Sequence, residues 1–167
     1  MYLTGEVDLP QQVVDAHVEG NLVLFVGAGA SMDSPSNLPT FTELARQVAR
    51  KRLMRDAVIA DFGTESDTLL GHLSRDGAPV HALVAEILGN PQSLPNDNHK
   101  AIVQIAATSR VPRIVTSNFD DHLACAARDA RIELGTKYTA PALPLGREFS
   151  GLVHLHGSLE GASEEMV

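Results

Sequence analysis

The chain has 167 residues, of which 44% are apolar, and this composition predicts one globular domain with a sizeable core. Its formal net charge of −8 and its lack of tryptophan argue against binding to nucleic acid. The single cysteine excludes an internal disulfide and a multi-cysteine zinc site, and it favours a reducing cytoplasm. Neither a signal pattern nor an apolar run of membrane length occurs, so we expect a cytoplasmic protein that makes no membrane contact.

The apolar run Leu22–Val26 predicts a strand that is buried on both faces. It leads into Gly27-Ala28-Gly29-Ala30-Ser31, a turn of small residues. Without large side chains in the way, the backbone amides of Gly27, Ala28 and Gly29 can converge on an anion such as a pyrophosphate. A plain tight turn between a strand and a helix explains the same residues equally well, because short glycine motifs recur by chance.

The spacing of apolar residues predicts further helices and strands along the chain. Thr40 and Glu43 form a capping box for one helix, and Asn96 or Asp97 can cap a later helix whose inner face includes Ile105. Helices are predicted around Val13–Val18, Phe41–Ala49, Leu69–Leu73, Val80–Leu88, Ile102–Ala106 and Phe119–Ala130. Two more strands are predicted at Arg113–Thr116 and Leu152–Leu155, and no element is predicted for residues 135–151, which are rich in glycine and proline.

Strands separated by long helical connections indicate βαβ crossovers. The expected fold is therefore α/β, a Rossmann-like parallel sheet with helices on both faces. Three strands make a narrow sheet for this class, and the sequence stops soon after the third. We therefore expect residues 1–167 to be one domain that is truncated at its carboxyl-terminal side, the leading portion of a longer domain.

Ligands of an open parallel sheet bind beyond the carboxyl ends of its strands, and each predicted strand ends there in a polar or glycine-containing cluster. After the second strand, Asn118 can hold a sugar hydroxyl or a water without titrating, or it can cap the helix that follows. Asp120 is expected in the first turn of that helix, where the helix dipole favours a carboxylate. After the third strand, His156 is the candidate general base, whereas His154 belongs to the strand and is expected in the interior. The histidines show no metal-ligand spacing, so no metal is expected.

Taken together, these clusters resemble the sirtuin-like NAD-binding fold. The resemblance lies in the order of four motifs over residues 22–158, which are Gly27-Ala28-Gly29-Ala30-Ser31, Leu38-Pro39-Thr40-Phe41, Thr116-Ser117-Asn118-Phe119-Asp120 and His156-Gly157. Asn98-His99 also resembles a structural feature of that family. The resemblance implies that Asn118 holds the nicotinamide ribose and a water, and that His156 is the catalytic base. The cofactor-binding residues that it implies are Gly27, Ala28, Gly29, Ser31, Phe41, Thr116 and Asp120, with Phe41 in a flexible loop that shields the nicotinamide.

The departures from the family point to one of its branches. Deacylating sirtuins carry a four-cysteine zinc module, and an Asp-Phe-Arg segment where this chain has Thr40-Phe41-Thr42. The Ser117-Asn118-Phe119-Asp120 segment resembles the divergent bacterial branch, whose members are typically NAD hydrolases fused or bound to other modules in anti-phage defence. This implies NAD as a substrate, no metal, and a homo-oligomer or a complex with another defence protein. The family usually adds a further strand and a glycine-containing loop at the adenosine end, and this sequence lacks both.

The leading hypothesis is hydrolysis of the nicotinamide–ribose bond of NAD. A non-catalytic module that binds NAD or ADP-ribose keeps the glycine turn and needs no base. An NAD-dependent protein deacylase needs an acyl-lysine tunnel that the sequence does not reveal. A dinucleotide-binding oxidoreductase ranks last, because Met32 stands where the third glycine of its fingerprint belongs.

Overall fold

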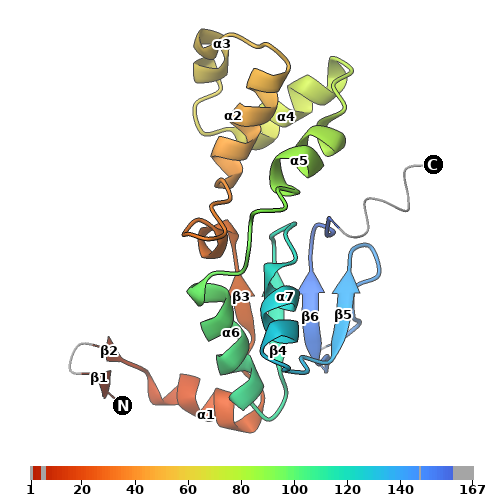
Figure 1. The fold of residues 1–167 in the computed structure, drawn as a ribbon. Helices are drawn as coiled ribbons and strands as arrows, with labels where there is room; N and C mark the ends of the chain where they lie inside the picture. The colour runs from red at the N-terminus through yellow and green to blue at the C-terminus, as the bar shows by residue number, and fades with distance from the viewer. Residues whose placement is uncertain (1, 5–6, 147, 160–167) are drawn as a thin grey trace.

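The computed structural model describes residues 2–4, 7–146 and 148–159, which form two lobes (Figure 1). One lobe is a β-sheet with helices beside it, and the other is a group of helices above the carboxyl ends of the strands. The strands are β1 (Tyr2–Thr4), β2 (Val7–Asp8), β3 (Leu24–Val26), β4 (Arg113–Thr116), β5 (Thr136–Thr139) and β6 (Gly151–His154). The helices are α1 (Gln11–Glu19), the 3-10 helix η1 (Ala28–Ser31), α2 (Phe41–Lys51), α3 (Asp56–Asp61), α4 (Ser66–Arg75), α5 (Val80–Leu88), α6 (Asp97–Thr108) and α7 (His122–Asp129).

The main sheet has four parallel strands in the order β3-β4-β6-β5, which confirms the α/β, Rossmann-like fold. Its register places Val26 beside Thr116 and Thr116 beside His154. The three strands that lead into the predicted motifs therefore end level with one another, and the loops that follow them meet at one edge. The sequence predicted three of these strands, whereas β5 and the small β1–β2 hairpin were not predicted.

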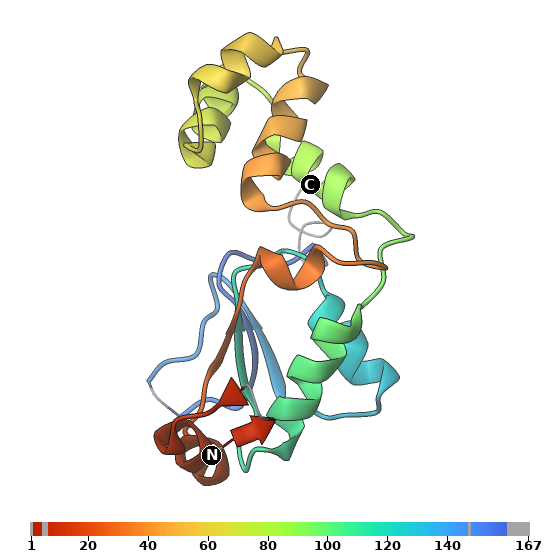
Figure 2. The same cartoon turned by 90° about the vertical axis from the view of Figure 1, so that its left-hand side faces the viewer.

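Helices cover one face of this sheet in the described part of the chain. Figure 2 shows α6 and α7 on the same side, where Val103 and Leu123 pack against Val26, Ile114 and Leu152. In this view α1 lies below the sheet, at the end where the strands begin, and no described helix covers the opposite face along the strands. The expectation of helices on both faces is therefore met on one face only.

Phe25 is 68% exposed, because it points away from the core and no helix of the described chain covers it. The prediction that the first strand is buried on both faces is wrong at this residue. The reason is positional, because β3 is an edge strand of the described sheet and its outward face meets no helix.

The helical lobe, α2 to α5, has a core of its own. Its central helix begins as predicted at Thr40, whose hydroxyl oxygen accepts the Glu43 N–H at 3.2 Å. Apolar spacing predicts an inner face of α2 made of Phe41, Leu44, Ala45, Val48 and Ala49. The last four are buried, with Val48 and Ala49 packed in the core that α2 shares with α3, α4 and α5, whereas Phe41 is 40% exposed. Helix α3 was not predicted. No helix among the described residues is long and apolar enough to cross a membrane.

Two details of helices α6 and α7 differ from expectation. Ile105, predicted on the inner face of α6, is 48% exposed because it lies two residues from the buried Val103 and so points elsewhere. Helix α7 begins at His122 after the cap residue Asp121, and not at Phe119. Asn118 is therefore not a helix cap, and Asp120 precedes the first helical turn.

Candidate functional site

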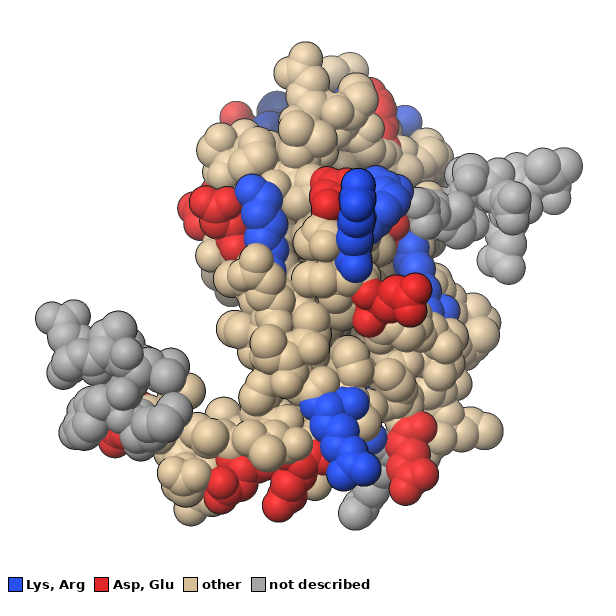
Figure 3. Space-filling model, turned by 60° about the horizontal axis from the view of Figure 1, so that its bottom comes forward, with Lys and Arg blue, Asp and Glu red and all other residues tan. Residues whose placement is uncertain are grey.

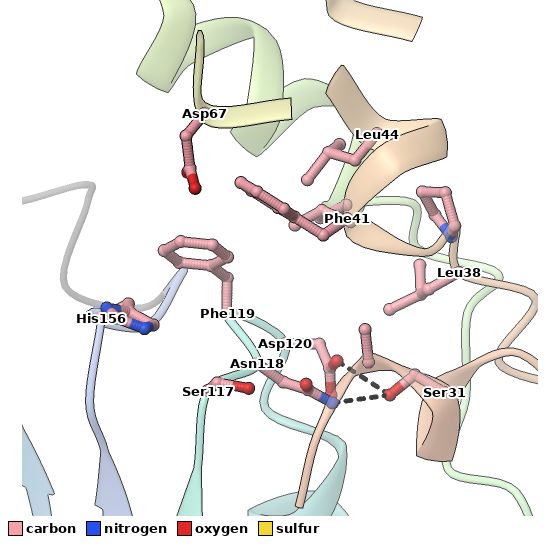
Figure 4. Close-up of a pocket in the computed structure, with 13 residues that line it drawn as sticks. Ser31, Leu38, Phe41, Leu44, Asp67, Ser117, Asn118, Phe119, Asp120 and His156 are labelled. Atoms are coloured by element: carbon pink, nitrogen blue, oxygen red, sulfur yellow. Dashed lines mark hydrogen bonds between the residues drawn. The ribbon is translucent and has the colours of Figure 1, made fainter. Parts of the chain in front are cut away.

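A pocket of about 560 Å³ lies where the loops after β3, β4 and β6 face the helical lobe (Figure 4). This volume is within the range of small-molecule sites. Six of the nine predicted site residues line it, namely Ala28, Ser31, Phe41, Asn118, Asp120 and His156. The other lining residues are Leu38, Pro39, Leu44, Asp67, Leu88, Ser117 and Phe119. Both lobes therefore contribute to one site.

Three predicted residues do not line this pocket. Gly27 and Gly29 line a separate shallow hollow of about 310 Å³ beside β3. Thr116 is 0% exposed, and its hydroxyl donates to the Val26 carbonyl at 3.1 Å and accepts the Asn118 N–H at 3.0 Å. In this structure Thr116 supports the loop after β4 from within the sheet.

The two glycines keep open space beside the turn. A Cβ built on Gly29 would meet no heavy atom within 4 Å, and one built on Gly27 would meet only the Ser117 Oγ at 3.9 Å. Neither glycine has a backbone in the left-handed region. The described chain therefore does not itself require glycine at these positions, and the free space lets a ligand approach the backbone closely.

Ser31 joins three elements through hydrogen bonds in the wall of the pocket. Its hydroxyl donates to the Asp120 Oδ2 at 2.9 Å and accepts the Asn118 Nδ2–H at 3.2 Å. Its third contact is the His99 Nε2 on α6, at 3.0 Å. Asp120 also accepts the His122 N–H at 3.2 Å, which ties the start of α7 to this cluster. Figure 4 shows the two bonds of Ser31 to Asn118 and Asp120.

Asn118 makes polar contacts with three residues, whereas its side-chain oxygen has no hydrogen-bond partner among the described residues. Besides its bonds to Ser31 and Thr116, its carbonyl oxygen lies 3.3 Å from the His154 Nδ1. Its side-chain Oδ1 is buried and has no hydrogen-bond partner among the described residues. Leaving such an acceptor buried and unpaired costs about 1–3 kcal/mol. A water or a ligand with a hydrogen-bond donor would remove that cost.

The two histidines near the end of β6 lie in different environments. His154 is fully buried, as predicted, and burial lowers its pKa although its contact with the Asn118 carbonyl and the charge of Asp121 oppose that shift. His156 is exposed and lines the pocket, with its ring 6.3 Å from the Phe119 ring. Figure 4 shows His156 and Ser31 on opposite sides of the pocket, with Phe119 and Asn118 between them.

The helical lobe supplies residues that the sequence did not reveal as part of the site. One of these residues is Asp67, whereas Phe41 was already named as a site residue. The family resemblance implied a flexible loop at Phe41, but Phe41 is the first residue of α2, as the apolar spacing predicted. Asp67 extends from α4 toward the rings of Phe41 and Phe119 in Figure 4. No Lys or Arg is among the described residues that line the pocket. A second cavity, of about 710 Å³, continues past Phe41, Leu44, Phe119 and His156 between the lobes.

The charged and metal-ligating residues elsewhere are dispersed. Acidic and basic side chains are interspersed on the face seen in Figure 3, and its described residues form no continuous basic patch. Among the residues that the structure describes, no group of three His, Cys, Asp or Glu side chains could hold a metal ion.

Comparison with known proteins found a sequence relative of this chain. No protein-family model matches it. It is 29% identical over 168 aligned positions to the uncharacterized protein y4cA of Sinorhizobium fredii (strain NBRC 101917 / NGR234). That alignment covers 91% of this chain and 14% of the relative, so the chain spans about one seventh of the length of the protein it resembles.

Proposed function

We propose that the pocket binds NAD as a substrate and that the chain hydrolyses the bond between nicotinamide and ribose. The observation that carries this proposal is the side-chain amide of Asn118, a residue that lines the same pocket as His156 and whose buried Oδ1 has no hydrogen-bond partner among the described residues. A carboxamide oxygen that accepts a hydrogen bond and an imidazole that can accept a proton are the two groups needed to orient and deprotonate a water. The surrounding motifs resemble those of sirtuin-like NAD hydrolases, and this resemblance is the basis for proposing NAD as the substrate.

In the proposed reaction, water attacks the anomeric carbon of the ribose while the bond from that carbon to the nicotinamide nitrogen breaks. The electron pair of the broken bond stays on nicotinamide, which leaves as a neutral molecule, and the proton of the water passes to His156. The products are ADP-ribose, nicotinamide and one proton. The role of the protein is to position the ribose and the water and to exclude bulk solvent.

The charges in the pocket fit the nicotinamide end of NAD. This ring is cationic until the bond breaks, and the Asp67 carboxylate and the faces of Phe41 and Phe119 favour a cationic ring. Because no Lys or Arg is among the described lining residues, the pocket holds no side-chain cation to repel it. The pyrophosphate would instead lie along the glycine turn, beside the open space at Gly29.

The test is the release of nicotinamide from NAD, measured by chromatography, with the 167-residue chain and with any longer natural protein that contains it. We expect Asn118→Ala and His156→Ala each to lower the rate at least about 100-fold. His72→Ala, which changes a partly exposed histidine of α4 outside the pocket, should keep the full rate. Full turnover in both pocket variants would refute the assignment.

A non-catalytic module that binds NAD or ADP-ribose is the second candidate, and the exposure of His156 favours it because a base in contact with bulk water is poorly sequestered. Calorimetry of NAD binding, combined with the release assay, separates the two candidates. Binding without release in both the chain and its longer natural form would select the module. A place in cytoplasmic anti-phage defence, as a homo-oligomer or with a second defence protein, belongs to the same proposal and rests on the resemblance alone.

A further inference from the structure

His99 lies behind the pocket wall, and its protonation can be derived from its neighbours. The side chain is 0% exposed and is placed by the first turn of α6, where Asn96 caps the helix. The backbone N–H of Asn96 points at the His99 Nδ1 at 3.2 Å. Because a backbone N–H can only donate, Nδ1 must carry a lone pair, and the proton of the neutral ring is on Nε2. Burial, which lowers the pKa of His99, favours this neutral ring.

The next group in the chain of contacts is the hydroxyl of Ser31, which has one proton to donate and two lone pairs to accept with. The His99 Nε2 lies 3.0 Å from Oγ and, being protonated, donates to it. The single hydroxyl proton goes to the Asp120 Oδ2 at 2.9 Å. One lone pair remains, so any further neighbour at this oxygen must be a donor.

That neighbour is the side-chain amide of Asn118, 3.2 Å from Ser31 Oγ. A flipped amide would bring Oδ1 against the hydroxyl oxygen, where no proton is left for it. The amide must therefore present its NH₂ group to Ser31 and its Oδ1 away from it, and this Oδ1 is the buried oxygen without a partner among the described residues. The backbone of Asn118 is held as well, because its N–H donates to the Thr116 hydroxyl and its carbonyl oxygen contacts the His154 ring.

We propose that His99 is a positioning residue which, through Ser31, fixes the side-chain amide of Asn118 so that it offers a hydrogen-bond acceptor to the pocket. His99 lies 68 residues from Ser31 in the sequence and does not line the pocket. The ligand group that meets Asn118 must then be a donor, such as a ribose hydroxyl or a water. The effect of His99 on catalysis rests on the proposed NAD hydrolysis, whereas the orientation of the amide does not.

The first arm of the test is independent of NAD. Long-range ¹H–¹⁵N spectra of the ¹⁵N-labelled chain at neutral pH report which ring nitrogen of each histidine is protonated, and His99→Gln identifies the signals of His99. We expect a neutral ring with the proton on Nε2. A proton on Nδ1, or a ring that is charged at neutral pH, would overturn the proposal even if the chain hydrolyses NAD.

The second arm uses the rate of nicotinamide release. His99→Leu keeps much of the side-chain volume but donates no hydrogen bond, so kcat should fall at least about tenfold with KM within about threefold. His99→Gln keeps an N–H group near the position of Nε2 and should recover most of that loss. Equal losses in the Leu and Gln variants would indicate a structural role alone and would overturn the proposal.

A serine pair provides the matched control. Ser31 and Ser36 are both 1% exposed, and Ser36 donates to the Leu94 carbonyl at 2.7 Å, away from Asn118. Ser31→Ala should lower kcat at least about tenfold, and Ser36→Ala should leave it unchanged at a similar loss of stability. Equal effects of the two changes would overturn the proposal. If the wild-type chain releases no nicotinamide, the proposed function fails, and the spectra alone decide the orientation.

Discussion

Lowering the pH from 7.5 to 5.5 should destabilise this chain because two of its buried histidines resist protonation. His99 and His154 are both 0% exposed, and burial is the main cause that lowers the pKa of each from the ordinary value of 6.5. In the unfolded chain these side chains keep their ordinary pKa. Below about pH 6.5 the unfolded state therefore binds more protons than the folded state, and the free energy of unfolding falls as the pH falls.

The size of this effect has an upper limit. A histidine that remains neutral in the folded state throughout loses at most about 1.4 kcal/mol of stability between pH 7.5 and pH 5.5, about 1 kcal/mol of it below pH 6.5, so the pair loses at most about 2.7 kcal/mol. The free energy of unfolding in urea, followed by circular dichroism at pH 7.5, 6.5 and 5.5, measures the loss. His99→Gln and His154→Gln should each remove about half of the pH dependence, and the double variant should remove both halves.

A wild-type stability that stays constant between pH 7.5 and pH 5.5 would refute the reasoning. So would a double variant that retains the wild-type pH dependence, because the protons would then be bound elsewhere. A single variant that is less stable at every pH by the same amount would also contradict the assignment for that histidine, because its loss would then reflect packing alone.

The remaining predictions concern backbone space, the pocket and the two cores. Gly151→Ala should lower the free energy of unfolding by about 3 kcal/mol or more, because φ at this residue is +135° and an added Cβ would overlap the Thr136 carbonyl oxygen. Gly29→Ala should change the free energy of unfolding by less than about 1 kcal/mol in the same urea assay, because an added Cβ there would meet no heavy atom within 4 Å. Ala28→Leu should fill the pocket and raise the KM for NAD without unfolding the chain, as measured by nicotinamide release and circular dichroism. Val48→Ala should cost about 2 kcal/mol, and hydrogen exchange should accelerate mainly in α2 to α5, because Val48 belongs to the core of that lobe.

The parts of the fold that the sequence predicted best are those set by local pattern. Helix α5 and strand β4 have the predicted bounds, Val80–Leu88 and Arg113–Thr116, because apolar spacing and a flanking proline define each of them locally. Strand β5 has the sequence Thr-Lys-Tyr-Thr and lies at an edge of the described sheet. It has no apolar run to reveal it, since its pairing with β6 comes from the rest of the sheet.

The site was predictable where motifs follow strands and unpredictable where the lobes meet. Asn118 and His156 could be placed at one edge because β4 and β6 are parallel and adjacent. Asp67 reaches the pocket only through the packing of the helical lobe, which no local pattern encodes. The contact between His99 and Ser31 likewise depends on the packing of α6 against η1, although the spacing of Asn96 and His99 could have revealed the unusual capping box.

The unpaired edge of β3 determines where another strand could join the described sheet. In the described sheet, the outer peptide groups of Leu24–Val26 pair with no other strand, and Phe25 stands beside them in solvent. The free N–H and C=O groups of such an edge can form hydrogen bonds with another strand. A strand added there would run alongside Gly27 and Gly29, which line the hollow beside β3, and not across the pocket at Asn118, so the sheet could widen without covering that pocket.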